Sequence, residues 1–316
     1  MKTFDVIALG ELNVDLILNR IAGFPEVGKE IFARDMICTL GSSTAIFAAN
    51  VSALGARTAF AGMIGRDAFG ELVRGSLEAR GVDTRYVIEA ADRATGVTVV
   101  MSYGEDRANV TYPGALRFAD LDPEIFLSAR HIHLSSLFMQ PGLLADIVPI
   151  LRAAHDGGAT VSLDTQWDPA EEWRIDCREV LPLIDVFMPN EAELTALAHA
   201  ASLDEAIGSV RPWLRRAMIV KRGSRGSVLV TAGGECREVG ALLNREAVDT
   251  IGAGDSFNAG FIRCFVRGGS LGECQDAGNL TGAISTTAAG GTGAFADREA
   301  AVRTARERFG KQLNLD

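Results

Sequence analysis

The sequence predicts an α/β protein in which helices cover both faces of a doubly wound parallel sheet, with a small β-sheet as a lid. Short apolar segments alternate with segments of helical periodicity through the second half of the chain, which is typical of a parallel sheet with crossover helices. Two separate segments of alternating polar and apolar residues interrupt this pattern in the first half. With 316 residues, 47% of them hydrophobic, the chain is long enough to bury a large core.

The expected elements follow one another along the chain, separated mostly by Gly and Pro residues. In the first half we expect strands at 4–9, 12–19, 30–38 and 58–62, helices at 41–54 and 68–80, and a hairpin of strands 96–103 and 107–112 joined by 104–106. In the second half we expect strands at 130–134, 159–163, 184–188, 217–221 and 226–230, and helices at 142–155, 191–200, 203–215, 255–266, 271–289 and 297–309. We assign 1–11, 41–95 and 114–316 to the α/β core, and 12–40 and 96–113 to a β-sheet lid that closes over a site.

Composition and charge argue against several classes of function. The net charge of −10 disfavours a surface for nucleic acid or anionic membranes. No apolar run reaches the roughly 18 residues that span a bilayer, and the N-terminal residues lack the features of a signal peptide. The five cysteines are scattered without a C-x-x-C pair, which predicts reduced thiols in a cytoplasmic protein.

The glycine-rich stretch at 249–257 carries the strongest functional signal. Gly252 and Gly254 permit a sharp turn, and the apolar positions behind it have helical spacing. Such a turn exposes backbone N–H groups at the positive end of a helix dipole, where an anion binds. Asp255 would repel that anion as a ligand, but it suits a general base that takes a proton from an attacking hydroxyl. A helix capped by Asp255 explains the short pattern equally well.

Two other positions follow predicted strands and offer phosphate or metal ligands. Asn190 and Glu193 share a face at a helix start, where an amide and a carboxylate can hold a hydrated Mg²⁺. The same spacing forms a capping box, which the spacing alone favours. Residues 221–226 offer cations and glycines to a polyphosphate, or form a plain turn with solvated charges. Residues 288–294 form a flexible turn that suits a cation or a purine, or is simply a loop.

The first strand is followed by candidate ligands for a polar molecule. Asn13 and Asp15 lie on one face of an expected strand, just beyond the carboxyl end of the first strand, where α/β sheets bind ligands. The alternative is an ordinary solvated strand face. Gly41 and Ser42 open the next helix and offer free N–H groups and a hydroxyl.

Three motifs occur in a characteristic order. Residues 249–257 match D-T-x-G-A-G-D-x-F, residues 190–193 match N-x-x-E, and residues 55–70 are similar to a glycine-rich N-terminal signature. With these motifs the sequence resembles the PfkB (ribokinase-like) family of carbohydrate kinases over essentially its whole length. The resemblance implies a ribokinase-like fold, ATP and Mg²⁺ as cofactors, and transfer of the γ-phosphoryl group to a hydroxyl of a small sugar.

The resemblance also implies roles for individual residues. Asp255 is the implied base, and the N–H groups of Gly252, Ala253 and Gly254 neutralise the moving phosphoryl group. The implied positions for the nucleotide, or for Mg²⁺ held through water, are Asn190, Glu193, Lys221, Gly223, Gly226 and Asn279. The implied positions for sugar hydroxyls are Asn13, Asp15 and Gly41, to which we add Ser42 at the same helix start. Asp249 and the 288–294 loop match the part of the family that often binds a monovalent cation such as K⁺.

Because of two departures from the family pattern, the sequence does not identify the sugar substrate. Ile46 stands where members with ribose-like substrates carry Asn, and Asn50 lies one turn later. Asp168 stands where 2-keto-3-deoxygluconate kinases carry Arg. We therefore expect a sugar kinase that acts on a primary hydroxyl, with a nucleoside kinase of the same fold and a non-catalytic sensor as alternatives. Because the lid has exposed edges, we also expect a homodimer that forms through it.

Overall fold

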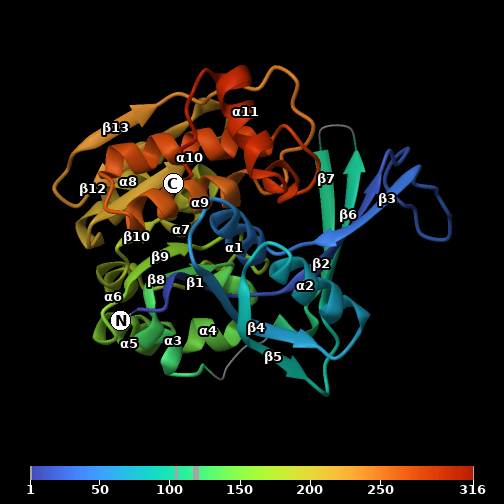
Figure 1. The fold of residues 1–316 in the computed structure, drawn as a ribbon, viewed down its shortest axis with the longest axis horizontal. Helices are drawn as coiled ribbons and strands as arrows, with labels where there is room; N and C mark the ends of the chain where they lie inside the picture. Colours follow the sequence, from blue (N-terminus) through green and yellow to red (C-terminus); the bar gives the residue numbers. More distant parts are fainter. Residues whose placement is uncertain (1, 104–105, 117–120, 316) are drawn as a thin grey trace.

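A nine-stranded sheet forms the centre of the molecule, as seen in a computed structural model that describes residues 2–103, 106–116 and 121–315 (Figure 1). Its strands lie in the spatial order β13 (Cys236–Val239), β12 (Ser227–Thr231), β11 (Ala217–Lys221), β10 (Val186–Phe187), β9 (Thr160–Asp164), β8 (Ala129–Ser135), β1 (Phe4–Leu9), β4 (Thr58–Gly65) and β5 (Asp83–Ala90). The strands from β11 to β5 pair in parallel. The expected fold class is therefore confirmed.

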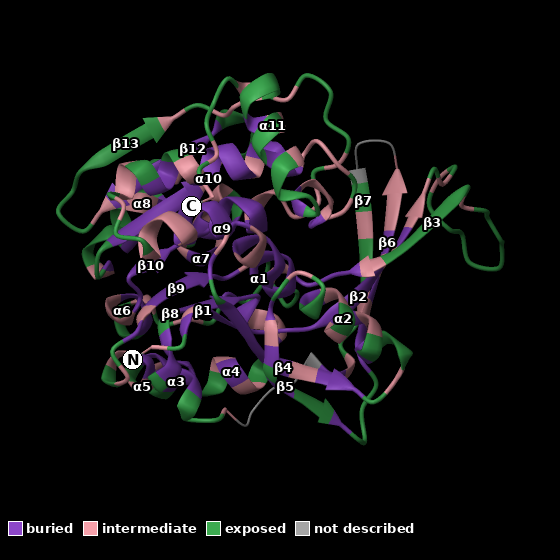
Figure 2. Cartoon of the chain, in the orientation of Figure 1, coloured by how far each residue is buried: buried purple, intermediate pink, exposed green. Residues whose placement is uncertain are grey.

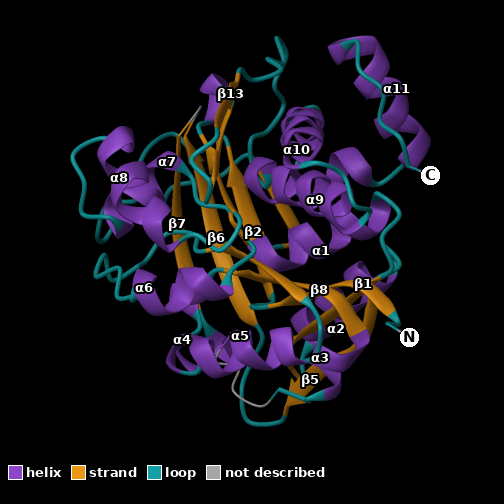
Figure 3. Ribbon diagram, turned by 90° about the vertical axis from the view of Figure 1, so that its left-hand side faces the viewer, coloured by secondary structure: helices purple, strands orange, loops and turns teal. Residues whose placement is uncertain are grey.

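Helices cover both faces of this sheet because each buried strand presents apolar side chains to two separate clusters. In β1, Ile7 and Leu9 belong to one cluster and Val6 and Ala8 to the other, as the two-residue period of a strand requires. The first cluster includes side chains from α3 (Glu124–Ser128), α4 (Pro141–Ala145), α5 (Ile147–Asp156), α6 (Cys177–Val180), α7 (Glu191–Leu197) and α8 (Leu203–Val210). The second includes side chains from α1 (Ser43–Ala53), α2 (Ala68–Glu78), α9 (Ala253–Val266), α10 (Leu271–Ser285) and α11 (Arg298–Phe309). Figure 3 shows α9 and α10 on one side of the strands and α7 and α8 on the other.

A separate four-stranded sheet stands beside the large one (Figure 1). Its strands lie in the order β3 (Asp35–Leu40), β2 (Asn13–Asn19), β6 (Gly96–Tyr103) and β7 (Asp106–Tyr112), so it combines the two segments expected to form a lid. Figure 2 shows that its outer part is more exposed than the central strands of the large sheet. The limits 12–40 and 96–113 for a lid, and its closing movement, stay predictions.

Several elements differ from the sequence-based expectation. The expected strand at 30–38 begins only at Asp35, where pairing with β2 starts. The strand expected at 226–230 runs antiparallel to β11, because the short turn between the two cannot hold a crossover helix. The strands β5 and β13 were not expected. All four residues of β13 are exposed or half-exposed, as is common for a strand at the edge of a sheet, and no alternation of apolar residues marks it in the sequence. The hairpin turn expected at 104–106 lies mostly outside the described residues.

Membrane-spanning helices were not expected from the sequence. Within the described ranges, every helix is too short or too polar to cross a bilayer.

Candidate active site

The helix α9 begins without a side-chain cap among the described residues, unlike α1, α2, α7, α8, α10 and α11. Gly252 occupies the N-cap position with φ 72°, in the left-handed region that favours glycine. A Cβ on Gly252 would lie 2.6 Å from Cα of Gly291, so this turn packs tightly on the 288–294 loop. Of the N–H groups expected to bind an anion, that of Ala253 donates to the Thr250 carbonyl at 3.3 Å. The uncapped first turn thus presents the positive end of the helix dipole to the site.

The Asp255 side chain does not cap its own helix. Its Oδ1 accepts hydrogen bonds from Ser43 Oγ and, at 3.4 Å, from Gln166 Nε2. The residue is only 7% exposed, and this burial raises the pKa of its carboxyl group to about 7, against the opposing effect of the Ser43 hydroxyl. The structure therefore removes the capping alternative and leaves a carboxyl group that changes charge near neutral pH.

Lys221, at the end of β11, supplies positive charge beside this carboxyl group. Its Nζ lies 2.5 Å from Oδ2 of the fully buried Asp164 at the end of β9. Burial would lower the pKa of Lys221, but the charges of Asp164 and Glu193 hold it above its usual value. The same Nζ lies 3.6 Å from the position that a Cβ on Gly254 would occupy. The ammonium group is thus placed next to the glycine turn.

Asn190 and Glu193 form the capping box of α7. Asn190 Oδ1 accepts from the Glu193 N–H at 2.9 Å, and the Glu193 carboxylate accepts from the Asn190 N–H at 2.9 Å and from Nδ2 at 2.6 Å. Burial, followed by the charge of Asp164, raises the pKa of Glu193 to about 7. The capping alternative is thus present in the structure, and the pair still faces the cavity described next.

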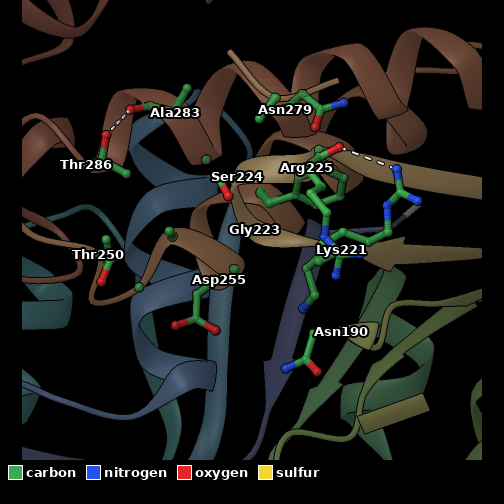
Figure 4. Close-up of a pocket in the computed structure, with 18 of the residues that line it drawn as sticks. Asn190, Lys221, Gly223, Ser224, Arg225, Thr250, Asp255, Asn279, Ala283 and Thr286 are labelled. Carbon is green, nitrogen blue, oxygen red and sulfur yellow. Dashed lines mark hydrogen bonds between the residues drawn. The ribbon is translucent and has the colours of Figure 1, made fainter. Parts of the chain in front are cut away.

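A cavity of about 880 Å³ joins these groups (Figure 4). Its lining includes every residue expected to bind phosphate, nucleotide or Mg²⁺, namely Asn190, Glu193, Lys221, Gly223, Gly226, Gly252, Ala253, Gly254, Asp255 and Asn279, whereas Asp249, expected to bind a monovalent cation, is not in the lining. Asn279 projects from α10, and its side chain bonds to Ser227 Oγ at 3.0 Å. A Cβ on Gly226 would lie 2.0 Å from the Val239 carbonyl oxygen, so only glycine fits at this turn. The size and the convergent polar groups are those of a ligand site.

The residues expected to bind sugar hydroxyls lie together but outside the lining of that cavity. Asn13 Nδ2 donates to Asp15 Oδ1 at 3.2 Å and to Thr98 Oγ1 at 2.7 Å, while the buried Asn13 Oδ1 has no partner among the described residues. A Cβ on Gly41 would lie 2.2 Å from Asp15 Oδ1. Burial raises the pKa of Asp15 to about 6, and the positive charge of Arg107, which lines the cavity from β7, opposes this rise. Arg107 therefore connects the two groups of residues.

Ser42 is already engaged as the N-cap of α1. Its Oγ accepts from the Ala45 N–H at 3.1 Å and donates to the Glu11 carbonyl at 2.6 Å. The next residue, Ser43, reaches Asp255 instead. A role for Ser42 in sugar binding stays a prediction, and its hydroxyl would have to exchange partners to fill it.

The departures from the family pattern have structural roles. Ile46 packs on the glycine turn, since its side chain lies 3.1 Å from where a Cβ on Gly252 would be. Asn50 Nδ2 donates to Ser256 Oγ and to the Gly291 carbonyl, both at 2.9 Å, so it ties α1 to α9 and to the 288–294 loop. The buried Asp168 carboxylate accepts three backbone N–H groups within its own loop.

Asp249 fixes the other side of the 288–294 loop. Its Oδ1 accepts from the Ile251 N–H at 2.9 Å and its Oδ2 from the Gly290 N–H at 2.8 Å. The carboxylate therefore joins the glycine-rich stretch to a loop that is rich in backbone carbonyl groups. This arrangement is compatible with a monovalent cation held mainly by carbonyl oxygens.

Several polar residues of the site were missed from the sequence. Asp164 and Gln166 follow an expected strand, and Asn258, which donates to Asp164 Oδ2 at 2.5 Å, lies one helical turn beyond Asp255. Glu11 is buried after β1, which raises its pKa, and its Oε2 accepts from Thr44 Oγ1 at 2.6 Å. The available signal was position, because each follows a strand end or shares a helix face with a predicted residue.

Comparisons with known proteins agree on one family. A family model described as pfkB family carbohydrate kinase matches residues 4–297. The chain is 32% identical over 284 residues to an ATP-dependent ribose-1-phosphate kinase from Halopiger xanaduensis, covering 89% of this chain and 91% of the relative. It is 28% identical over 274 residues to a nucleoside kinase from Methanothermobacter thermautotrophicus, covering 85% of each. The solved structure of Arabidopsis thaliana ribokinase with ribose and ATP superposes with a TM-score of 0.81 at 25% identity, covering 97% of this chain and 99% of that one.

The tight packing of Gly252 leads to a stability prediction with a matched control. We expect Gly252→Ala to lower the free energy of unfolding by about 2 kcal/mol or more, because a Cβ there is strained by φ and clashes with Gly291. Gly254→Ala, two residues away, meets only ordinary contacts and should leave stability unchanged or slightly raised. Urea unfolding of both variants measures the difference, and equal stability would show that the turn is not constrained as described.

Proposed function

The chain belongs to the pfkB family of carbohydrate kinases, and from this premise we propose that Asp255 is the general base for phosphoryl transfer from ATP to a primary hydroxyl of a small sugar. The observation that supports this role best is a buried carboxyl group with a pKa of about 7 at the uncapped start of α9. An acid–base group acts best when its pKa lies near the working pH. We also propose a cytoplasmic location, supported by five free cysteines.

The proposed reaction uses groups that already converge. Asp255 takes the proton of the acceptor hydroxyl, the acceptor oxygen forms a bond to the γ-phosphorus, and the bond from that phosphorus to the β–γ bridging oxygen breaks to release ADP. Negative charge that develops on the transferring group meets the N–H groups of Gly252 and Gly254 and the Lys221 ammonium group beside them. Phosphoryl transfer depends on such positioning and charge stabilisation.

We propose that different residues hold Mg²⁺ and K⁺. The oxygens of Asn190 and Glu193 are of the kind that Mg²⁺ prefers, and because they are already paired with each other they suit an ion held through water. When bound, the ion neutralises phosphate charge. Asp249 would hold the carbonyl-rich 288–294 loop in place for K⁺.

The role of Asp255 is tested by removing only its ability to accept a proton. We expect Asp255→Asn to lower kcat by about 10²–10⁴-fold, the usual contribution of a general base, with ATP affinity nearly unchanged. Asp156→Asn, an exposed residue at the end of α5, is the matched control and should keep full activity. A coupled ADP-release assay over a sugar panel measures both. Near-wild-type turnover by Asp255→Asn would rule out the base assignment.

A second candidate function differs in the charge of the substrate that accepts the phosphoryl group. Among the described residues no carboxylate lies within ion-pair distance of Arg107, although it lines the cavity and its charge reaches Asp15. The similar ribose-1-phosphate kinase is named for a phosphorylated substrate. We therefore propose an anionic sugar, such as a sugar phosphate, as the alternative to a neutral sugar, while a nucleoside remains the alternative that the similar nucleoside kinase suggests.

A substitution of Arg107 distinguishes between these acceptors experimentally. If the acceptor is anionic, Arg107→Gln should lower kcat/KM for it by about 10–100-fold, since a hydrogen bond between charged groups contributes about 1.5–3 kcal/mol. Arg20→Gln, which removes an exposed arginine paired with Asp35 at the opposite edge of the same sheet, is the control. The panel should contain neutral sugars, sugar phosphates and nucleosides. Full activity of Arg107→Gln on a sugar phosphate would contradict the anionic alternative.

We propose that the homodimer forms through one face of the small sheet. The strand register places Arg107, Asp15 and Asn13 on the face toward the cavity. The opposite face is formed by Val14, Leu16, Leu18, Met36, Cys38, Leu40, Val97, Val99, Met101, Ala108, Val110 and Tyr112. Met36, Val110 and Tyr112 are 64%, 61% and 57% exposed. Exposed apolar surface of this kind favours association, so the face supports the proposal better than the strand edges do.

Sedimentation tests the dimer. We expect the wild-type chain to sediment as a dimer at micromolar concentration and Val110→Glu to sediment as a monomer, because the new charge would be buried in the interface. Leu127→Glu places the same charge on another exposed leucine, in α3, and should leave the dimer intact. A monomeric wild-type chain would contradict the proposal.

A further inference from the structure

The orientation of the Asp255 carboxylate is determined by Ser43 and Gln166, two neighbours that lie outside the three signature motifs of the chain. Oδ1 accepts from Ser43 Oγ and from Gln166 Nε2. The structure gives Oδ2 no hydrogen-bond partner among the described residues. One oxygen is therefore held by the protein, and the other is left for a ligand in the cavity.

Gln166 has its amide orientation fixed by the groups around it. Its Nε2 lies 3.1 Å from Asp164 Oδ2, 3.4 Å from Asp255 Oδ1 and 2.8 Å from Ser43 Oγ. The Asp164 carboxylate, which is paired with Lys221, only accepts hydrogen bonds, so the nitrogen and not the oxygen of this amide faces it. Gln166 also has φ 56°, an unusual backbone conformation for a residue with a side chain, and strain of this kind is often found at functional sites.

The Ser43 hydroxyl has one direction left for its proton. Gln166 Nε2 can only donate to Ser43 Oγ, and Ser135 Oγ lies 3.0 Å from it as a second neighbour. If Ser135 donates, both lone pairs of Ser43 Oγ are occupied, and its proton points at Asp255 Oδ1. Ser43 is thus a donor to the carboxylate rather than a competitor for the proton of the acceptor.

We infer that Ser43 and Gln166 are positioning residues that hold Oδ1 of Asp255, so that Oδ2 is the atom that takes the proton from the acceptor hydroxyl. This inference rests on the proposed function of Asp255. It assigns a direction to the proton transfer: the acceptor O–H bond breaks, the proton moves to Oδ2, and Ser43 keeps its own proton throughout. It also gives roles to Ser43 and to Gln166, neither of which belongs to the signature motifs of this chain.

The hydrogen bond from Ser43 to Asp255 affects how the activity depends on pH. Among the described residues, the charged groups that act on Asp255 are Asp164 at the end of β9, Lys221 at the end of β11 and Glu11 after β1. Burial raises the pKa of Asp255 to about 7, and the Ser43 hydrogen bond lowers it because the bond favours the charged form. The base works when deprotonated, so activity is lost as pH falls through this pKa. Removal of the Ser43 hydroxyl raises the pKa further and moves that loss to higher pH.

The experiment compares Ser43→Ala, Gln166→Ala and the double variant by steady-state kinetics from pH 5.5 to 9. We expect each single variant to lower kcat by about 10–100-fold, the effect of one hydrogen bond to a charged group, with KM for ATP unchanged and the acid limb of the Ser43→Ala profile at higher pH. Ser43→Thr keeps the hydroxyl and should recover most of the activity. Ser52→Ala, which removes another α1 hydroxyl that donates to the Arg80 carbonyl at 2.8 Å, is the matched control.

The outcomes separate this inference from the proposed function. If Asp255→Asn is inactive while Ser43→Ala and Gln166→Ala keep wild-type kcat and an unmoved acid limb, the positioning role is wrong and the base stands. If Asp255→Asn is active, both fail. A purely structural role for Ser43 would lower the midpoint of thermal unfolding and leave the acid limb in place, and that result would also overturn the inference.

Discussion

The balance of buried charge at the start of α9 is the constraint on which the site depends. Among the described residues, the carboxyl groups of Glu11, Asp164, Glu193 and Asp255 are buried around the site, and the ammonium group of Lys221 is paired with Asp164. Burial is costly for charge, so the pKa values of Asp255 and Glu193 rise to about 7. Asp255 therefore binds a proton near neutral pH, which is the property that its proposed role requires.

The topology explains why these groups meet. Parallel strands place their carboxyl ends at one edge of the sheet, so Glu11 after β1, Asp164 at the end of β9 and Lys221 at the end of β11 come together although they are far apart in sequence. The α9 dipole points its positive end at the same place. Gly252 and Gly41 allow the close approach, since a Cβ at either would overlap Gly291 or Asp15. The small sheet adds Asp15 and Arg107 from outside the large sheet.

Hydrophobic periodicity, a local signal, was enough to predict the fold class and the two-part small sheet. The residues that line the cavity were predicted from the glycine-rich motif and from the resemblance to the family. The sequence did not predict β5, whose buried residues do not alternate strictly with exposed ones, or β13, in which no residue is buried. It also missed the contacts that Ser43, Gln166 and Asn258 make with partners 212, 89 and 94 residues away in the chain. Contacts over such distances depend on tertiary packing, and the spacing of residues within a motif does not contain them.

The proposed role of Asp255 depends on a buried carboxyl group whose pKa is raised to the neutral range. The most direct measurement is a ¹³C NMR titration of the side-chain carboxyl groups, in which the signal of Asp255 is assigned by its loss in Asp255→Asn. The account predicts that this signal titrates near pH 7. A titration near pH 4, the usual range for an aspartate, would contradict it.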